Sequence, residues 1–442
     1  MNPIIYLPCE IKNREFDSRL MVAAHALHQG YTVVLGQQWA FARNTPTLPE
    51  GVMLVKTVNA IQAEFMEDLK ATGHIVAGSD EEVLAMASAD GFLLPVSPRA
   101  VKAADVFLAN SAQHRDALLG AYPDLKDKIT VTGNPRIDLM SPALRRKFQP
   151  EADAIRRKMG PFVLFNTNYG STNSVWGDFK EAAKIAIQAG LLDRNDPASV
   201  QRYNDLLAFE QANMQALLDV MKSVANDSTT HRAVIRPHPG EKVDFWQRFT
   251  AHARITVVPR SHHIPWLMAA DLVVHTCCTT GMEALALGTP AINVSPVPQN
   301  WWYGLYLMKH VNCCITDSAE AAQAVQTYLS SRSGPLADQE GYYKKLGDWF
   351  PTLNTRDAAK RMADALIAAL KARGAHKPVK FTWALRGEAF KHDVRTDNQR
   401  DKFSVTPQEV VDGLKYFMTA DKLERTFDLK QLDDSLFLLQ PA

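Results

Sequence analysis

Short apolar runs alternate with amphipathic segments along the first third of the chain. The run IIYL (4–7) is followed by FDSRLMVAAHALHQG, which carries apolar side chains at helical spacing. Gly30 ends that segment, as glycine often ends a helix, and the strand-like run YTVVLG comes next. The same rhythm continues through NAIQAEFMEDLKATG, HIVAG, EEVLAMASA, ADVFLAN, SAQHRDALLGAYP and KITVTG. Strands that alternate with helices of about 10–15 residues predict βαβ units and a parallel sheet.

The rhythm is interrupted at 141–160, where the segment is polar and charged, and it restarts at 161. The later strands are PFVLFNTN, HRAVIRPHP, RITVVP, DLVVHT and PAINVSP, and an amphipathic helix covers 355–374. The pattern predicts an α/β protein with two Rossmann-like, doubly wound domains. We expect them at 1–140 and 161–375, with an interdomain linker at 141–160 and a small C-terminal appendage at 376–442. Two such domains in series predict a cleft, because ligands bind outside the carboxyl ends of the strands.

Composition narrows the class of protein. The chain has 442 residues, of which 46% are hydrophobic and 22% charged, and its formal net charge is +1. Such a chain has enough residues for two cores, and it has no global field that would attract nucleic acid, so no nucleic-acid partner is expected. The sequence has no apolar run of transmembrane length and no signal-peptide pattern. We therefore expect a cytoplasmic protein that associates with a membrane at most peripherally, at its inner face.

The five cysteines are odd in number and include two adjacent pairs, Cys277–Cys278 and Cys313–Cys314. This is a poor disulfide framework and lacks the CxxC spacing of zinc sites, so buried reduced thiols are expected.

The turn after the first strand, LPCEIKNREFDSR, is crowded with charge. It carries Glu10, Lys12, Arg14, Asp17 and Arg19. A solvated surface loop would explain it, but loops at this position in α/β folds usually face the ligand crevice. The three cations are therefore candidates for binding an acidic substrate, together with Glu10, and Asp17 is a candidate catalytic acid.

A second strand exit, AGSDEEVLA, carries Asp80, Glu81 and Glu82. Acids suit the first turn of a helix, which is a purely structural explanation. The functional interpretation is a general base, because crowded carboxylates raise one another's pKa.

A third exit, FNTN, places Asn166, Thr167 and Asn168 after an apolar strand. These uncharged groups could bind phosphate or sugar hydroxyls, or they could form an Asx turn.

The fourth region combines RPHPGE with HTCCTTGMEALALGTP. Thr279 and Thr280 begin a predicted helix whose N-terminus suits an anion, and Glu283, one turn later, could accept from ribose hydroxyls. In RPHP, the flanking prolines restrict His238, and Arg236 lies two residues before it. His275 ends the next strand but one, so these side chains are candidate ligands of a phosphate.

Several other sites are disfavoured. The sequence has neither a P-loop nor a GxGxxG after its first strand. The His262–His263 pair lacks a carboxylate or cysteine at suitable spacing and is interpreted as part of a loop, so no metal site is expected.

The order RPHP–E, then PWLMAADLVVHTCCTTGMEALALGTP, resembles the C-terminal nucleotide-sugar domain of GT-B glycosyltransferases. More narrowly, the chain resembles bacterial surface carbohydrate biosynthesis proteins. That resemblance also covers EIKNREFDSRLMVAAHALHQGYTVVLG, SDEE, VTGNPRID, FNTN and the tail, and so spans nearly the whole chain.

The wider group includes bacterial sialyltransferases, polysialyltransferases and β-Kdo transferases, which use CMP-activated ulosonic acids. These enzymes combine an acidic motif with a His-Pro motif and a Ser/Thr motif. Glu81-Glu82 match the acids, His238-Pro239 the His-Pro motif and Thr279-Thr280 the hydroxyl motif, while Val83 departs from the expected glycine. The resemblance implies CMP binding by the C-terminal domain and acceptor binding mainly by the N-terminal domain.

The function that these observations predict is a metal-independent glycosyltransferase without a cofactor. It would move Kdo or a nonulosonic acid, of pseudaminic, legionaminic or sialic type, from a CMP-sugar to a glycan acceptor such as lipopolysaccharide or capsule. His238 and Arg236 would hold the leaving phosphate with the 279–280 helix terminus. Glu81, Glu82 or Asp17 would act as base or nucleophile, which gives inversion or retention respectively.

Three alternatives remain open. A CDP-glycerol-type polyol-phosphate transferase has a similar RxHP element, and a nucleotide-sugar epimerase can have the same fold. An inactive GT-B protein that serves in assembly is the third.

Overall fold

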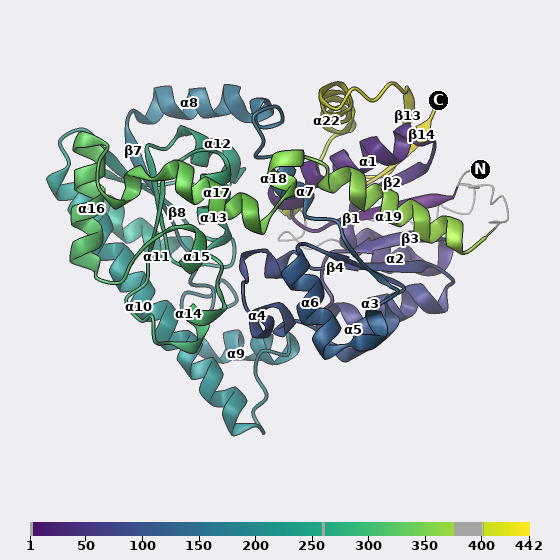
Figure 1. Cartoon of the computed structure of the whole chain (residues 1–442), viewed down its shortest axis with the longest axis horizontal. Coiled ribbons are helices and arrows are strands. Elements are labelled where there is room, and N and C mark those ends of the chain that lie inside the picture. The colour runs from purple at the N-terminus through teal and green to yellow at the C-terminus, as the bar shows by residue number, and fades with distance from the viewer. Residues whose placement is uncertain (1–2, 259–260, 375–399, 401) are drawn as a thin grey trace. The chain divides into compact units, whose positions relative to one another are not determined.

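The computed structural model describes residues 3–258, 261–374, 400 and 402–442. By its internal contacts the chain divides into two units. Unit 1 comprises 1–82, 96–144 and 350–442, and unit 2 comprises 83–95 and 145–349. Figure 1 labels the helices and strands, and each unit is described separately below.

Unit 1 is built on an eight-stranded sheet within the described residues. Its strands are β1 (Ile4–Cys9), β2 (Thr32–Gln37), β3 (Gly51–Val55), β4 (Ile75–Ser79), β5 (Val106–Ala109), β6 (Ile129–Val131), β13 (Phe427–Asp433) and β14 (Leu436–Pro441), in the order β13-β14-β2-β1-β3-β4-β5-β6. The first six strands run parallel, while β14 pairs antiparallel with β2 and with β13. All six residues of β1 are buried, which explains why the run is apolar without alternation.

Helices cover both faces of this sheet. Its helices are α1 (Asp17–His28), α2 (Gln38–Asn44), α3 (Ala60–Ala71), α5 (Pro98–Ala103), α6 (Ala112–Ala121), α7 (Pro135–Asp138), α18 (Thr352–Thr355), α19 (Ala358–Ala372) and α22 (Pro407–Ala420). Helix α1 packs against both α19 and α22, and α3 packs against α5 (Figure 1). Helix α22 begins with a capping box of Thr406 and Glu409, as its sequence TPQE favours.

Unit 2 is built on a six-stranded parallel sheet within the described residues. Its strands are β7 (Phe162–Asn166), β8 (Arg232–Arg236), β9 (Ile255–Val257), β10 (Leu272–His275), β11 (Ala291–Val294) and β12 (Cys313–Ile315), in the order β12-β11-β10-β7-β8-β9. Its helices are α4 (Ala89–Leu93), α8 (Gln149–Met159), α9 (Phe179–Gln188), α10 (Pro197–Asp227), α11 (Val243–Gln247), α12 (His263–Ala269), α13 (Thr279–Ala286), α14 (Trp301–Leu305), α15 (Met308–Val311), α16 (Ser318–Ser331) and α17 (Gln339–Trp349).

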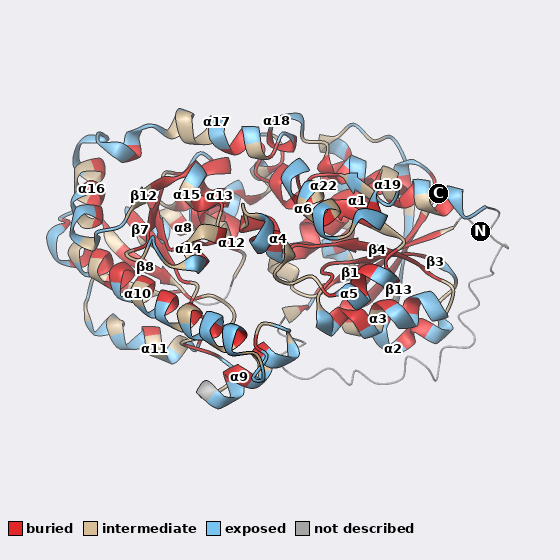
Figure 2. Cartoon of the chain, turned by 60° about the horizontal axis from the view of Figure 1, so that its bottom comes forward, coloured by how far each residue is buried: buried red, intermediate tan, exposed pale blue. Residues whose placement is uncertain are grey.

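The core of unit 2 lies on the face of the sheet that α10 and α16 cover. Phe165, Ile235 and Val274 point from the strands into this core and meet Val220 of α10 and Val325 of α16. Most strands of both sheets are buried (Figure 2), whereas the edge strands β6 and β13 are partly exposed. Burial of this continuous apolar surface is the main stabilising contribution to folding.

The predicted architecture of two doubly wound α/β domains is confirmed. The boundaries differ from those expected. Helix α19, predicted within the second domain, belongs to unit 1, and the linker helix α8 belongs to unit 2. The described part of the tail from 400 onward also joins unit 1, because β14 extends its sheet beside β2 and α22 covers α1. These contacts are long-range in sequence, and local periodicity carries no information about them.

Two local expectations also change. EEVLAMASA was expected to be helical, but it forms a 3-10 turn at Glu82–Ala85. Its first amide is taken by the side chain of Asp80, and the Glu81 carbonyl accepts from Arg14. No disulfide links the five cysteines, as expected.

Candidate functional site

The strands of unit 2 end in a row of polar side chains. Asn166 of β7 pairs in register with Arg236 of β8, and His275 of β10 pairs with Asn293 of β11. Val274 pairs with Phe165, so His275 also lies beside Asn166. Residues paired in a parallel sheet point to the same face, and Phe165 points into the α10 core. The row therefore lies on the opposite face, at the carboxyl end of the sheet.

Asn166 and Arg236 are incompletely hydrogen-bonded. Both polar atoms of the Asn166 side chain are buried without a hydrogen-bond partner among the described residues, and the same holds for Arg236 Nε. Arg236 Nη2 donates to the carbonyl of Ser261 at 2.9 Å. Burial lowers the pKa of Arg236, an effect opposed by the charge of Glu283. Buried polar atoms of this kind are costly in a folded protein and mark a site where a ligand can supply the missing bonds.

His238 follows β8 and is held in a single ring orientation. Its backbone N–H donates to Thr167 Oγ1 at 2.9 Å, and the Gly240 N–H donates to its Nδ1 at 3.1 Å. Because Nδ1 accepts, the proton of the neutral ring lies on Nε2. His238 is thus prepared as a hydrogen-bond donor through Nε2.

The side chain of Glu241 fixes this loop through hydrogen bonds. Its carboxylate is fully buried and accepts from Thr167 Oγ1 at 2.7 Å, from Tyr169 N at 2.9 Å and from Trp246 Nε1 at 2.9 Å. Burial raises the pKa of Glu241, although these donors oppose the shift. Thr167 therefore links Glu241 to the His238 backbone, so both residues position His238. Asn168, one residue after Thr167, is partly exposed.

The start of α13 contributes two hydroxyls and the amide groups of its first turn. Thr279 and Thr280 are both partly exposed, and the Thr280 hydroxyl lies 3.1 Å from Cys278 Sγ. The turn before them is strained, because Cys277 has φ +49, a conformation that residues other than glycine rarely adopt. The Cys277 N–H donates to Asn293 Oδ1 at 2.6 Å, which fixes this turn.

His275 and Glu283, both expected to contact ligand, are engaged inside the protein. The His275 ring is buried, and burial lowers its pKa to about 3. A Cβ at Gly281 would lie 2.0 Å from His275 Nε2, so α13 can approach the ring only with glycine there. Glu283 is fully buried and pairs with His263 Nε2 at 3.1 Å. Sequence reasoning placed His263 in a loop, whereas it begins α12.

Unit 1 gathers its strand-end charges into one ion network. The Lys56 ammonium contacts Glu10 and lies 3.8 Å from Glu15 and 3.9 Å from Glu82. Burial alone would lower the pKa of Lys56, but Glu15 and Glu10 raise it. Lys402, from the tail, contacts Glu10 at 2.8 Å.

Glu81 and Glu82 are adjacent but differ in accessibility. The Glu81 side chain is 3% exposed and contacts Arg19 at 3.0 Å and Arg136 at 3.8 Å. The Glu82 side chain is 45% exposed and contacts Arg14 at 3.1 Å. The Arg14 charge lowers the pKa of Glu82 to about 2. Glu82 is therefore the accessible, ionised carboxylate of the pair.

The remaining candidates in unit 1 are less open to ligand. Burial raises the pKa of Asp80 to about 7, and its carboxylate accepts from Thr57 and from the Glu82 amide. Asp17 is buried at the start of α1, and Lys12 contacts Glu409 of α22 at 2.6 Å.

Sequence reasoning included Glu15 only as one of the charges that crowd the turn after β1, and it missed Lys56, Arg136 and Lys402 as members of the network. Lys56 follows β3 directly, so it is a strand exit that the same argument could have included. Among the described residues, no group of three His, Cys, Asp or Glu side chains could hold a metal ion.

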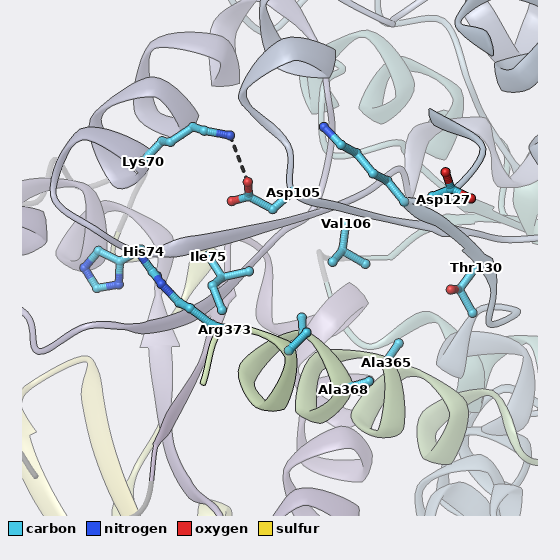
Figure 3. A pocket seen from close by; sticks show the side chains of 13 residues that line it. Lys70, His74, Ile75, Asp105, Val106, Asp127, Thr130, Ala365, Ala368 and Arg373 are labelled. Atoms are coloured by element: carbon cyan, nitrogen blue, oxygen red, sulfur yellow. Dashed lines mark hydrogen bonds and ion pairs between the residues drawn. The ribbon is translucent and has the colours of Figure 1, made fainter. Parts of the chain in front are cut away.

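A cavity of about 710 Å³ lies elsewhere in unit 1 (Figure 3). The first residues of β4 and β5 line it, together with the last turns of α19 and the ion pair between Lys70 and Asp105 at 2.8 Å. This is the amino end of the sheet, opposite to the carboxyl end where ligands bind in such folds. The cavity is therefore not part of the candidate site.

Comparison with known proteins gives the fold. No family model matches the sequence, and no curated protein matches it. A histidine-to-alanine variant of the wall teichoic acid polymerase TagF aligns with TM-score 0.50 and 11% identity over 85% of this chain and 90% of that chain. A putative UDP-N-acetylglucosamine 2-epimerase from Listeria monocytogenes aligns with TM-score 0.50 and 13% identity over 86% of this chain and 99% of that chain. The fold is of the GT-B type.

No helix among the described residues has the length and apolar character needed to cross a membrane.

Proposed function

We propose that the chain is a GT-B glycosyltransferase that transfers an acidic sugar, Kdo or a nonulosonic acid, from a CMP-activated donor to a surface glycan. The observation that carries the proposal is the fixation of His238. The Gly240 amide assigns its proton to Nε2, and Thr167 and Glu241 fix its backbone. A rigid neutral donor of this kind suits a phosphate whose negative charge grows as the glycosidic bond breaks.

Unit 2 would bind the nucleotide. Arg236 supplies a positive charge beside His238, and Thr279 and Thr280 supply hydroxyls at the positive end of α13. The buried amide of Asn166 would bond to the bound nucleotide, because it has no partner among the described residues. These groups can stabilise a leaving phosphate by themselves, so we propose that the reaction is independent of metal.

The Glu283 assignment changes within this proposal. Since Glu283 is buried against His263, it can hold a ribose only if that ion pair opens. We propose instead that the pair fixes the junction of α12 and α13.

Unit 1 carries the candidate carboxylates. Glu82 is accessible and stays ionised at neutral pH, whereas Glu81 is buried between two arginines. A carboxylate with a pKa of about 2 is a weak base, so its chemistry favours attack on the anomeric carbon or stabilisation of positive charge there. Arg14 and Lys12 are partly exposed and paired with Glu82 and Glu409, and they stay our candidates for the sugar carboxylate, whereas Arg19 is buried.

Thermal unfolding of the full chain with CMP, CDP, UDP and GDP tests the proposal. CMP is expected to raise Tm, because a ligand at about 100 times its Kd stabilises the native state by about 2.7 kcal/mol. His238→Ala should abolish the rise, while His252→Ala should leave it unchanged, since His252 precedes β9 at the opposite end of the sheet.

Two outcomes would contradict the proposal. If no cytidine nucleotide raises Tm, the CMP-donor assignment is wrong. If CDP or UDP acts and CMP does not, the polyol-phosphate transferase or epimerase alternative replaces it.

A further inference from the structure

Large apolar side chains reach the surface mainly around two loops of unit 2. The exposed members among the described residues are Ile61, Val175, Trp176, Ile187 and Trp301. Four of these five belong to the connections that follow β7 and β11. Trp176 is 51% exposed, and a tryptophan that faces water to this extent is informative because the residue is usually well buried.

The loop that carries Trp176 is locked to the His238 loop. The Val175 N–H donates to the Gly240 carbonyl at 2.8 Å, and the Lys242 N–H donates to the Asn173 carbonyl at 3.0 Å. Lys242 Nζ also donates to the Gly177 carbonyl at 2.7 Å. Trp176 is therefore presented by a braced segment, and its exposure does not result from a loose loop.

The backbone on the C-terminal side of Trp176 turns sharply before α9 begins. Gly177 has φ +132, which lets the chain turn directly after Trp176, and Asp178 then caps α9 through the amides of Lys180 and Glu181. The Trp176 ring has no aromatic contact among the described residues. The exposed indole is thus carried by a segment that is hydrogen-bonded to the loop after His238.

The surroundings favour a carbohydrate partner over a protein or a membrane. The exposed neighbours Asp178, Lys180 and Lys242 are polar or charged with mixed sign. Trp176 and the neighbouring Val175 together offer too little contiguous apolar surface for a stable protein interface. The mixed charge also lacks the basic character that anionic lipids attract. A flat ring with hydrogen-bonding groups around it matches the alternating C–H and hydroxyl surfaces of a pyranose.

We propose that Trp176 is a stacking platform for a pyranose ring of the glycan acceptor. Asn166 is buried and Arg236 is partly buried, whereas a glycan chain that extends into solvent meets exposed groups such as Trp176. The inference deepens the proposed function and rests on it for the term acceptor. The saccharide binding itself is a separate measurable property.

Binding of the fluorescently labelled full chain to a microarray of bacterial surface oligosaccharides tests the proposal. Wild-type protein is expected to bind a subset of the glycans, and Trp176→Ala should weaken that binding at least about tenfold, which corresponds to about 1.4 kcal/mol. Trp176→Phe should retain most of it, because a phenyl ring can also stack. Trp301→Ala serves as the matched control for loss of an exposed indole and should bind as the wild type does.

The same variants separate this proposal from the proposed function. Trp176→Ala should keep the CMP-induced rise in Tm. If CMP does not raise the Tm of the wild type but the wild type binds glycans through Trp176, the nucleotide proposal is wrong and the stacking proposal stands. Three results would overturn the platform: no glycan bound by the wild type, equal binding by Trp176→Ala, or equal losses in Trp176→Ala and Trp301→Ala. If Trp176→Ala weakens binding of CMP-N-acetylneuraminate but not of any glycan, the ring belongs to the donor and the acceptor assignment is wrong.

Discussion

Both sheets carry a cluster of polar side chains at the carboxyl ends of their strands, but the two clusters are stabilised differently. In unit 1 the cluster is ionic: Glu81 lies between Arg19 and Arg136, and Lys56 contacts Glu10. In unit 2 buried carboxylates face hydrogen-bond donors. Glu241 accepts from an amide, a hydroxyl and an indole.

The difference appears in the pKa values of accessible and buried acids. Arg14 lowers the pKa of Glu82 to about 2, whereas burial raises the pKa of Asp80 in the same unit and of Glu210 in unit 2 to about 7. A nearby cation favours the ionised form of an acid, and burial favours its neutral form. The acids of unit 1 named above are held by cations, while Glu241 of unit 2 holds the His238 loop through uncharged donors.

The largest effect is expected for Arg19→Leu. Arg19 is fully buried beside Glu81, so its loss leaves Glu81 with Arg136 alone, and breaking such a pair costs about 3–5 kcal/mol. Urea denaturation of the full chain measures the loss. The double variant Arg19→Leu/Glu81→Leu should recover part of it, because Glu81 is no longer left short of a cation, although Arg136 then loses its contact with Glu81. A single variant that loses less than about 1 kcal/mol would show that the network does not depend on this pair.

Glu241→Ala is expected to have the next largest effect, a loss of about 2–4 kcal/mol, since it strands several buried donors. Glu241→Gln keeps one acceptor oxygen and should lose less. In both variants, a His238-dependent response to CMP should weaken along with stability, because Thr167 links the two residues. Unfolding in urea and the CMP-induced shift in Tm measure the two effects. If Glu241→Ala keeps the full CMP-induced shift in Tm, Glu241 is not required to position His238.

The sequence predicts some of this contrast and not the rest. The strand exits, the His-Pro turn and the helix at Thr279 follow from periodicity and position. The partners of these groups do not: the side chain of Glu241 accepts from Thr167 and Tyr169, which lie in the loop after β7, 72–74 residues away. Likewise, nothing local links Lys402 to Glu10, or β14 to β2. Strand pairing and tertiary contacts determine which acid is accessible and which is buried and fixes a loop through hydrogen bonds.

The pH dependence of the free energy of unfolding tests whether Glu210 of unit 2 is protonated in the folded protein. This residue of α10 accepts from the Ser171 and Thr172 amides, and burial raises its pKa to about 7 from 4.5. The folded state therefore holds a proton that the unfolded state has lost, so wild-type stability should fall as pH rises through about 4.5 to 7. Glu210→Gln removes this dependence, and its stability relative to wild type should rise by about 1–3 kcal/mol between pH 5 and pH 8. Thermal unfolding across that range measures the difference. A gap that is constant with pH would mean that Glu210 is ionised in the folded protein.

The smallest effect is expected at the accessible carboxylate of unit 1. Glu82→Gln should cost less than about 1 kcal/mol at pH 7, because its pair with Arg14 is partly solvent-exposed. Its pKa is lowered in the folded state, so the stabilisation is present above pH 4.5, the ordinary pKa, and is lost as pH falls through about 2. Urea unfolding of wild type and Glu82→Gln at pH 7 and pH 3 should show the gap narrowing at the lower pH. A loss as large as that of Arg19→Leu would place Glu82 within the locked network. Unit 1 would then have no ionised carboxylate available for chemistry at this strand end.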